Sequence, residues 1–136
     1  MGEQVQDTAP GRSAPPGRAD IRANPFPAIA IIHKWAIGSR ALGYAVSSQL
    51  FELCVMIADR MNPKRDGEYR AWPGRGQIAE DMGCGEGKVK AALRQLRAHP
   101  LCPISQEIRG RHDAPIYRLT AAAFETAGLP TLACTA

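Results

Sequence analysis

Basic side chains between residues 88 and 118 are the groups in this sequence best suited to binding a ligand. The stretch holds seven Lys and Arg against two acidic residues, a net charge of +5 in a chain of 136 residues whose total is +4. Cations at this density suit a polyanion, because neutralising its phosphates releases condensed counterions. The alternative is a charged surface that only faces solvent.

Patterns typical of an enzyme or a metal site do not accompany these cations. The four cysteines form no CxxC pair, the three histidines have no HxxxH spacing, and no phosphate-binding loop or nucleophile with a suitably spaced base is present. We therefore expect no catalysis and no bound cofactor, metal or small molecule. Cys54 lies in an apolar helical pattern and is predicted to be a small core residue.

Length and composition favour one folded domain. A chain of 136 residues has room for one core, and its 45% hydrophobic residues can fill it. Residues 1–24 are rich in Pro, Gly and charge and predict a flexible arm, 25–126 form the domain, and 127–136 form a tail. No apolar run approaches the ~18 residues of a membrane span and no signal sequence is recognisable, so we expect a cytoplasmic protein with no membrane partner.

Hydrophobic periodicity and turn residues place helices and strands around the basic segment. A first helix begins after Pro27 and breaks at Gly38. A stronger helix is capped by Ser47 or Ser48 and ends before Pro63. The pattern further predicts an extended segment at 68–72, helices at 76–82 and 86–98, a hairpin with strands at 104–109 and 116–119, and a last helix at 121–126, capped by Thr120 and docked through Phe124.

The spacing of Ala79, Gly83 and Val89 is what a helix-turn-helix needs. A small residue allows two helices to touch, a glycine adopts the positive φ of a tight turn, and an aliphatic residue returns to the core. A basic helix and a hairpin complete the order of a winged helix-turn-helix, a mainly α fold with a small β hairpin. In this fold the segment 72–119 would bind double-stranded DNA, with its recognition helix at about 86–98 and its wing at about 104–119. An ordinary helical hairpin without a DNA role is the alternative.

Three short motifs carry a resemblance to known proteins. They are Ala71-Trp72-Pro73-Gly74-Arg75-Gly76-Gln77-Ile78-Ala79, Met82-Gly83-Cys84-Gly85 and Val89-Lys90-Ala91-Ala92-Leu93-Arg94-Gln95-Leu96. Residues 50–119 resemble the winged helix-turn-helix domains of bacterial, plasmid and phage replication and regulatory proteins. Those domains tend to carry a Trp-Pro-Ser step, an Ile-Ala or Leu-Ala pair, a Leu-Gly-Val-Ser turn and a Val-x-x-Ala-Leu-x-x-Leu helix. The resemblance implies a fold and double-stranded DNA as the partner, without specifying the biological process.

Two positions depart from that family pattern. Gly85 stands where the family prefers a capping Ser, although glycine can also cap a helix. Glu86 and Gly87 stand where polar or basic residues usually face DNA. Glu86 can favour the helix dipole, accept from a cytosine amino group or repel phosphate, and the dipole role is favoured.

The winged helix predicts which side chains contact DNA. Arg94 can make a bidentate contact with guanine, and Lys88 and Lys90 can bind phosphate or base. Wing residues are expected to follow phosphates or enter the minor groove, and residues that begin the preceding helix are expected to anchor a phosphate. Trp72 is predicted to pack beneath that helix. The predicted DNA-binding residues are Arg75, Gln77, Lys88, Lys90, Ala91, Arg94, Gln95, Arg97, Arg109, Arg111 and His112.

The predicted function is sequence-specific binding of double-stranded DNA, as a transcriptional regulator or as a replication or partition accessory of a mobile element. A homodimer is expected, because one recognition helix and one wing seldom suffice, and the apolar segment 28–53 is a possible interface. The alternative is a protein-interaction module of the same fold in a phage or conjugation assembly, with its basic face on an acidic partner.

Overall fold

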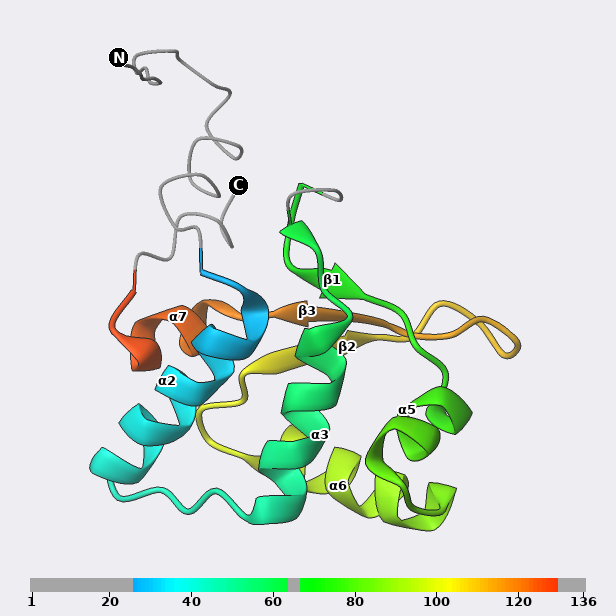
Figure 1. Cartoon of the computed structure of the whole chain (residues 1–136), viewed down its shortest axis with the longest axis horizontal. Helices are drawn as coiled ribbons and strands as arrows, with labels where there is room; N and C mark the ends of the chain where they lie inside the picture. The colour runs from blue at the N-terminus through cyan, green and yellow to red at the C-terminus, as the bar shows by residue number, and fades with distance from the viewer. Residues whose placement is uncertain (1–25, 64–66, 130–136) are drawn as a thin grey trace.

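Helices dominate the structure of this chain, a computed structural model that describes residues 26–63 and 67–129 (Figure 1). The arm predicted at 1–24 and residues 130–136 of the predicted tail lie outside the described residues. The prediction of a mainly α fold with a small β component is confirmed. The described elements are α2 (Ala28–Ala41), α3 (Ser48–Asp59), β1 (Arg70–Ala71), α5 (Arg75–Met82), α6 (Glu86–Ala98), β2 (Ile104–Glu107), β3 (Ile116–Leu119) and α7 (Ala121–Ala127).

The three strands form one antiparallel sheet in the order β1-β3-β2. The predicted hairpin is present as β2 and β3, although β2 ends at Glu107 rather than at residue 109. β1, from the extended segment predicted at 68–72, pairs with the other edge of β3. Side chains of β3 alternate between two faces, so Tyr117 and Leu119 are buried and Arg118 is only half-buried.

One hydrophobic core lies between the helices and the inner face of the sheet. Its largest fully buried side chains include Trp35 of α2, Tyr117 of β3 and Phe124 of α7, which docks as predicted. The Trp35 Nε1 donates to the Leu101 carbonyl oxygen at 2.7 Å, which satisfies the polar atom of this buried ring. Cys54 is buried as predicted, and this burial raises the pKa of its thiol, which therefore stays protonated and unreactive.

Two predicted capping side chains begin their helices. Of the two serines considered for α3, Ser47 is the N-cap, and its Oγ accepts from the Leu50 backbone N–H at 3.1 Å. The Thr120 Oγ1 accepts from the Ala123 backbone N–H at 3.2 Å and begins α7. These bonds determine where α3 and α7 start on the core.

The predicted break at Gly38 is wrong, because α2 continues through it to Ala41. A different requirement explains the glycine. α7 lies along α2, and a Cβ at residue 38 would be 2.1 Å from the Thr126 carbonyl oxygen. The absence of a side chain lets the two backbones approach each other, so α2 and α7 form one packed unit.

Gly38→Ala should lower the free energy of unfolding by at least ~1–3 kcal/mol, since the added methyl group meets a backbone carbonyl that moves only if α7 moves. Urea denaturation followed by circular dichroism measures this loss. Gly87→Ala is the matched control, because a Cβ there meets nothing within 4 Å and the substitution should stabilise α6 by up to ~1 kcal/mol. Equal effects at both positions would contradict the close packing of α2 on α7.

Candidate nucleic-acid interface

A tight turn at Gly83 sets the angle between α5 and α6. α5 ends there with a φ of +67°, in the left-handed region that glycine adopts freely. The Cys84 backbone N–H donates to the Ala79 carbonyl oxygen at 3.0 Å and closes the turn. The glycine turn predicted from the sequence is confirmed, and α6 begins at Glu86 after the N-cap Gly85.

α6 has the predicted bounds and carries one buried and one charged side. Lys90, Arg94 and Arg97 are exposed. Their spacing of four and three residues places them on the same side of a helix with 3.6 residues per turn. The buried side consists of Val89, Ala92, Leu93 and Leu96.

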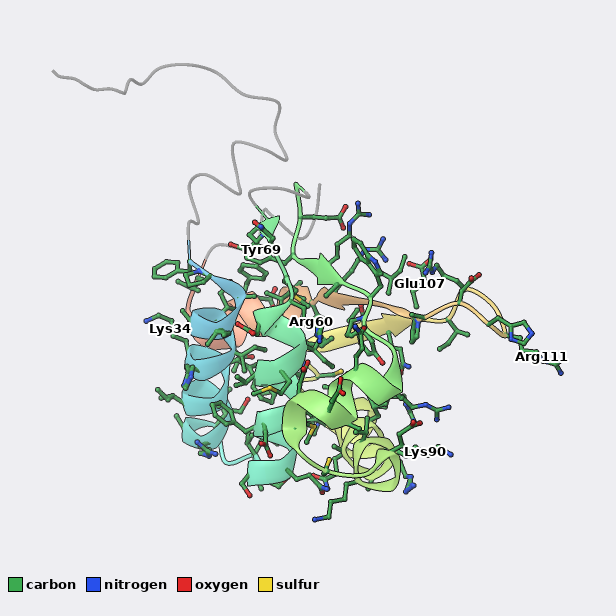
Figure 2. The ribbon with its side chains drawn as sticks, turned by 45° about the vertical axis from the view of Figure 1, so that its right-hand side comes forward. Lys34, Arg60, Tyr69, Lys90, Glu107 and Arg111 are labelled. Carbon is green, nitrogen blue, oxygen red and sulfur yellow. The ribbon has the colours of Figure 1, made fainter. Side chains whose placement is uncertain are left out.

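An open groove of about 620 Å³ lies between α6, the start of α5 and the loop that joins β2 to β3. Figure 2 shows Lys90 on α6 and Arg111 at the tip of the hairpin, both on the side away from Lys34. The cations come from three separate elements, so only folding brings them together. The predicted site residues that line the groove are Arg75, Lys90, Arg94, Arg97, Arg111 and His112.

The groove is strongly positive, and Asp113 is the one acidic residue in its lining. Within the described residues, Lys90, Arg94 and Arg111 take part in no ion pair or side-chain hydrogen bond. The Arg97 Nη1 donates to an uncharged group, the side-chain oxygen of Gln106, at 3.2 Å. An anionic ligand would therefore meet cations whose charge is not already neutralised.

Gln106 and Ile108 are among the residues that line the groove without having been predicted as DNA contacts. Gln106 had a signal: Ile104 is buried, and side chains two residues apart on a strand share a face. The same spacing within the predicted strand 104–109 reaches Ile108, which in the structure follows β2 and is 70% exposed. The groove thus combines cations with an amide and with apolar side chains of the hairpin.

Lys88, Ala91 and Gln95 do not line the groove, although all three are predicted DNA contacts. The Gln95 Oε1 accepts from the Ser47 Oγ at 2.6 Å, and its Nε2 donates to the Gln49 Oε1 at 3.1 Å. A seven-residue spacing places Lys88 on the same side of α6, where its carbonyl oxygen accepts from the Gln49 Nε2 at 3.4 Å. Gln95 therefore fastens α6 to the start of α3, and Ala91 is half-buried.

The prediction that Trp72 packs beneath α5 is wrong, because its side chain is 45% exposed. The preceding Ala71 points into the core, so the next side chain of this extended segment points outward. The Arg70 guanidinium carbon lies 5.7 Å from the centroid of the indole ring, within range of a cation–π contact. Trp72 and Gln77 line a separate hollow of about 280 Å³ with Arg60, so Gln77 lies outside the cationic groove.

The Arg109 side chain bonds across the hairpin loop. Its Nε and Nη2 donate to the Ala114 carbonyl oxygen at 3.1 and 3.0 Å. These two bonds hold the planar guanidinium against the backbone, so a contact with DNA would compete with them. Arg111 and His112, between the two bonded residues, are exposed.

Arg118 contributes little free charge to the basic segment. On the outer face of the sheet its Nη1 donates to Glu107, and its Nε donates to the Glu68 Oε1 at 3.1 Å. The hydrogen bond to Glu107, followed by that to Glu68, raises the pKa of Arg118. The guanidinium is charged but paired with two carboxylates, so α6, the hairpin loop and Arg75 carry the charge available to a ligand.

Glu86 lies beside the first turns of two helices. It belongs to the first turn of α6, and its Oε2 would be 3.6 Å from a Cβ at Gly76, in the first turn of α5. The N-caps of both helices, Gly74 and Gly85, provide no side-chain hydrogen bond. Negative charge is favourable at such helix ends, and the geometry therefore favours the dipole role among the three predicted for Glu86.

No protein-family model, curated protein or solved structure matches this chain. In the part of the chain that the structure describes, no three His, Cys, Asp or Glu side chains are grouped so as to hold a metal ion. None of the described helices combines the length and the apolar character needed to cross a membrane.

Arg109→Ala should loosen the hairpin loop, because the Ala114 carbonyl oxygen loses both of its guanidinium donors. Backbone amide hydrogen exchange over residues 108–115 should accelerate about ten-fold, corresponding to a loss of ~1.4 kcal/mol. Arg111→Ala is the control, since its side chain makes no hydrogen bond among the described residues. Exchange that is unchanged in Arg109→Ala would show that the bidentate bond does not hold the loop.

Proposed function

We propose that the protein binds double-stranded DNA through the cationic groove, as a winged helix-turn-helix with α6 as recognition helix and the β2–β3 hairpin as wing. The order of the elements supports this fold: α3, β1, the α5–α6 pair and the hairpin follow one another as they do in a winged helix. The left-handed glycine between α5 and α6 supplies the tight turn of a helix-turn-helix.

The convergence of Lys90, Arg94 and Arg111 on one open groove is the observation that carries the proposal. The major groove of DNA is about 12 Å wide and admits one α-helix, with phosphates along both of its edges. A helix that enters it with a charged loop alongside can reach base edges and phosphates together. This arrangement of cations suits a duplex better than a small anion, since it extends from α6 to the hairpin tip (Figure 2).

Each cation has a role in this proposal. Lys90 and Arg94 reach base edges or the phosphates next to them, and Arg94 has the fork geometry for the O6 and N7 of guanine. Arg111 at the hairpin tip follows the backbone or the minor groove, together with His112. Arg75, the first residue of α5, lines the same groove and holds a further phosphate there.

We further propose that binding is sequence-specific and serves transcription, replication or partition of a mobile element. A homodimer fits this role, because two half-sites add affinity and specificity. Much of the segment predicted as the interface is committed to the core, as the fully buried Leu53 illustrates. The exposed large side chains Ile37, Leu42 and Tyr44 are what this segment retains for pairing with a second copy.

Lys90→Ala and Arg94→Ala should each weaken DNA binding by ~1–3 kcal/mol where the side chain contacts a base edge. Each lost phosphate contact should instead lower the slope of log affinity against log salt by about one. Fluorescence anisotropy, with duplexes that the wild-type protein selects from a random pool, measures both quantities. Binding itself should weaken steeply as salt rises.

Two variants serve as controls for the DNA measurement. Lys34→Ala removes a lysine from the side of the molecule away from the groove (Figure 2), so affinity should not change. Gln95→Ala should lower stability by ~0.5–1.5 kcal/mol through its lost bonds to Ser47 and Gln49, and leave affinity unchanged. A wild-type protein that retards no duplex even at low salt would contradict DNA binding and favour the protein-interaction module.

A further inference from the structure

The Tyr117 hydroxyl is buried without a hydrogen-bond partner. Its side chain is fully buried on β3, opposite Ala71 of β1 on one side and Gln106 of β2 on the other. Buried polar groups of native proteins are nearly always paired, and an orphaned hydroxyl is costly. This atom therefore points to a partner that the described chain does not supply.

Gln106, the cross-strand neighbour of Tyr117, lines the groove and so links this part of β3 to it. Arg75 and Arg97 are near enough for their charges to act on the phenol, and both line the groove. Guanidinium groups donate and cannot accept. The carbonyl oxygen of the Gln106 side chain, on the neighbouring strand, already accepts from Arg97 at 3.2 Å. Burial raises the pKa of Tyr117 despite the opposing effect of the two arginines, so its O–H remains a donor at neutral pH.

We propose that the inner end of the groove binds one phosphate oxyanion, with Arg75 and Arg97 on its oxygens and the Tyr117 O–H donating to one of them. A water molecule would satisfy the hydroxyl alone, whereas a phosphate also neutralises both guanidinium groups through charge-assisted hydrogen bonds. Arg75 and Arg97 are exposed, so their long side chains can rearrange as the anion enters and reaches the hydroxyl.

Which molecule supplies the phosphate is an inference that rests on the proposed function. When α6 and the hairpin engage a duplex, a backbone phosphate lies between the start of α5 and the end of α6, where Arg75 and Arg97 stand. Inorganic phosphate offers the same oxyanion chemistry without DNA. The two sources are separated by measuring both ligands on the same variants.

Tyr117→Phe tests the proposal, since it removes the hydroxyl and keeps the packed ring. Its affinity for the selected duplexes should fall about ten-fold, as expected for a lost hydrogen bond to a charged group. Inorganic phosphate should raise the thermal midpoint of the wild type above its value in chloride at equal ionic strength, and this rise should be reduced in the variant. Tyr69→Phe is the matched control, because its buried ring lies outside the groove and its hydroxyl donates to the Phe26 carbonyl oxygen at 2.9 Å. This variant should lower the thermal midpoint but leave the duplex affinity and the phosphate-induced rise unchanged.

The outcomes separate this inference from the proposed function. If the wild type binds DNA and Tyr117→Phe matches it in duplex affinity and phosphate response, the oxyanion site is overturned and DNA binding stands. If the wild type binds no duplex but phosphate stabilises it through Tyr117, DNA binding fails and the site takes free phosphate. If Tyr117→Phe loses duplex affinity but responds to inorganic phosphate as the wild type does, the site binds a phosphate of the DNA backbone. If Tyr117→Phe does not fold, Arg97→Gln takes its place. That variant should lose duplex affinity and phosphate response, and an Arg97→Gln protein that keeps both would overturn the proposal.

Discussion

Burial of one side of α6 is the constraint on which the candidate interface depends. An α-helix is rigid, so the apolar residues that it places in the core determine where its other side chains point. Lys90 and Arg94 face the groove because the hydrophobic contacts of Val89 and Leu96 leave α6 no other orientation. On the opposite flank, the bonds of the Gln95 amide to α3 oppose rotation of the helix about its axis.

Among the described residues, some arginines are bonded within the fold and others line the groove. Arg60 pairs with Asp81 at 2.9 Å, Arg118 pairs with two carboxylates, and Arg109 binds a backbone carbonyl, so these three support α5, the sheet and the hairpin loop. The groove cations lack carboxylate partners among the described residues. The first group positions the second, because the elements it holds are those that carry the groove.

Helix and strand positions were largely predictable because they follow from neighbouring residues. The bounds of α6, the turn at Gly83 and the caps Ser47 and Thr120 each rest on a few adjacent side chains. Local signals failed where one pattern has two explanations. A glycine inside a helical pattern can break the helix or allow a second helix to approach, and only the Thr126 carbonyl beside Gly38 decides between them.

By itself, the sequence determined the elements and the segment that carries excess positive charge, because periodicity, turn preference and charge are local properties. Tertiary structure decided which cations act together: Arg75, Lys90 and Arg111 meet in one groove although they belong to three elements. It also decided which cation is neutralised, since the Glu68 partner of Arg118 is 50 residues away in the chain. Contacts between distant residues depend on how the elements pack, and a local pattern does not contain that information.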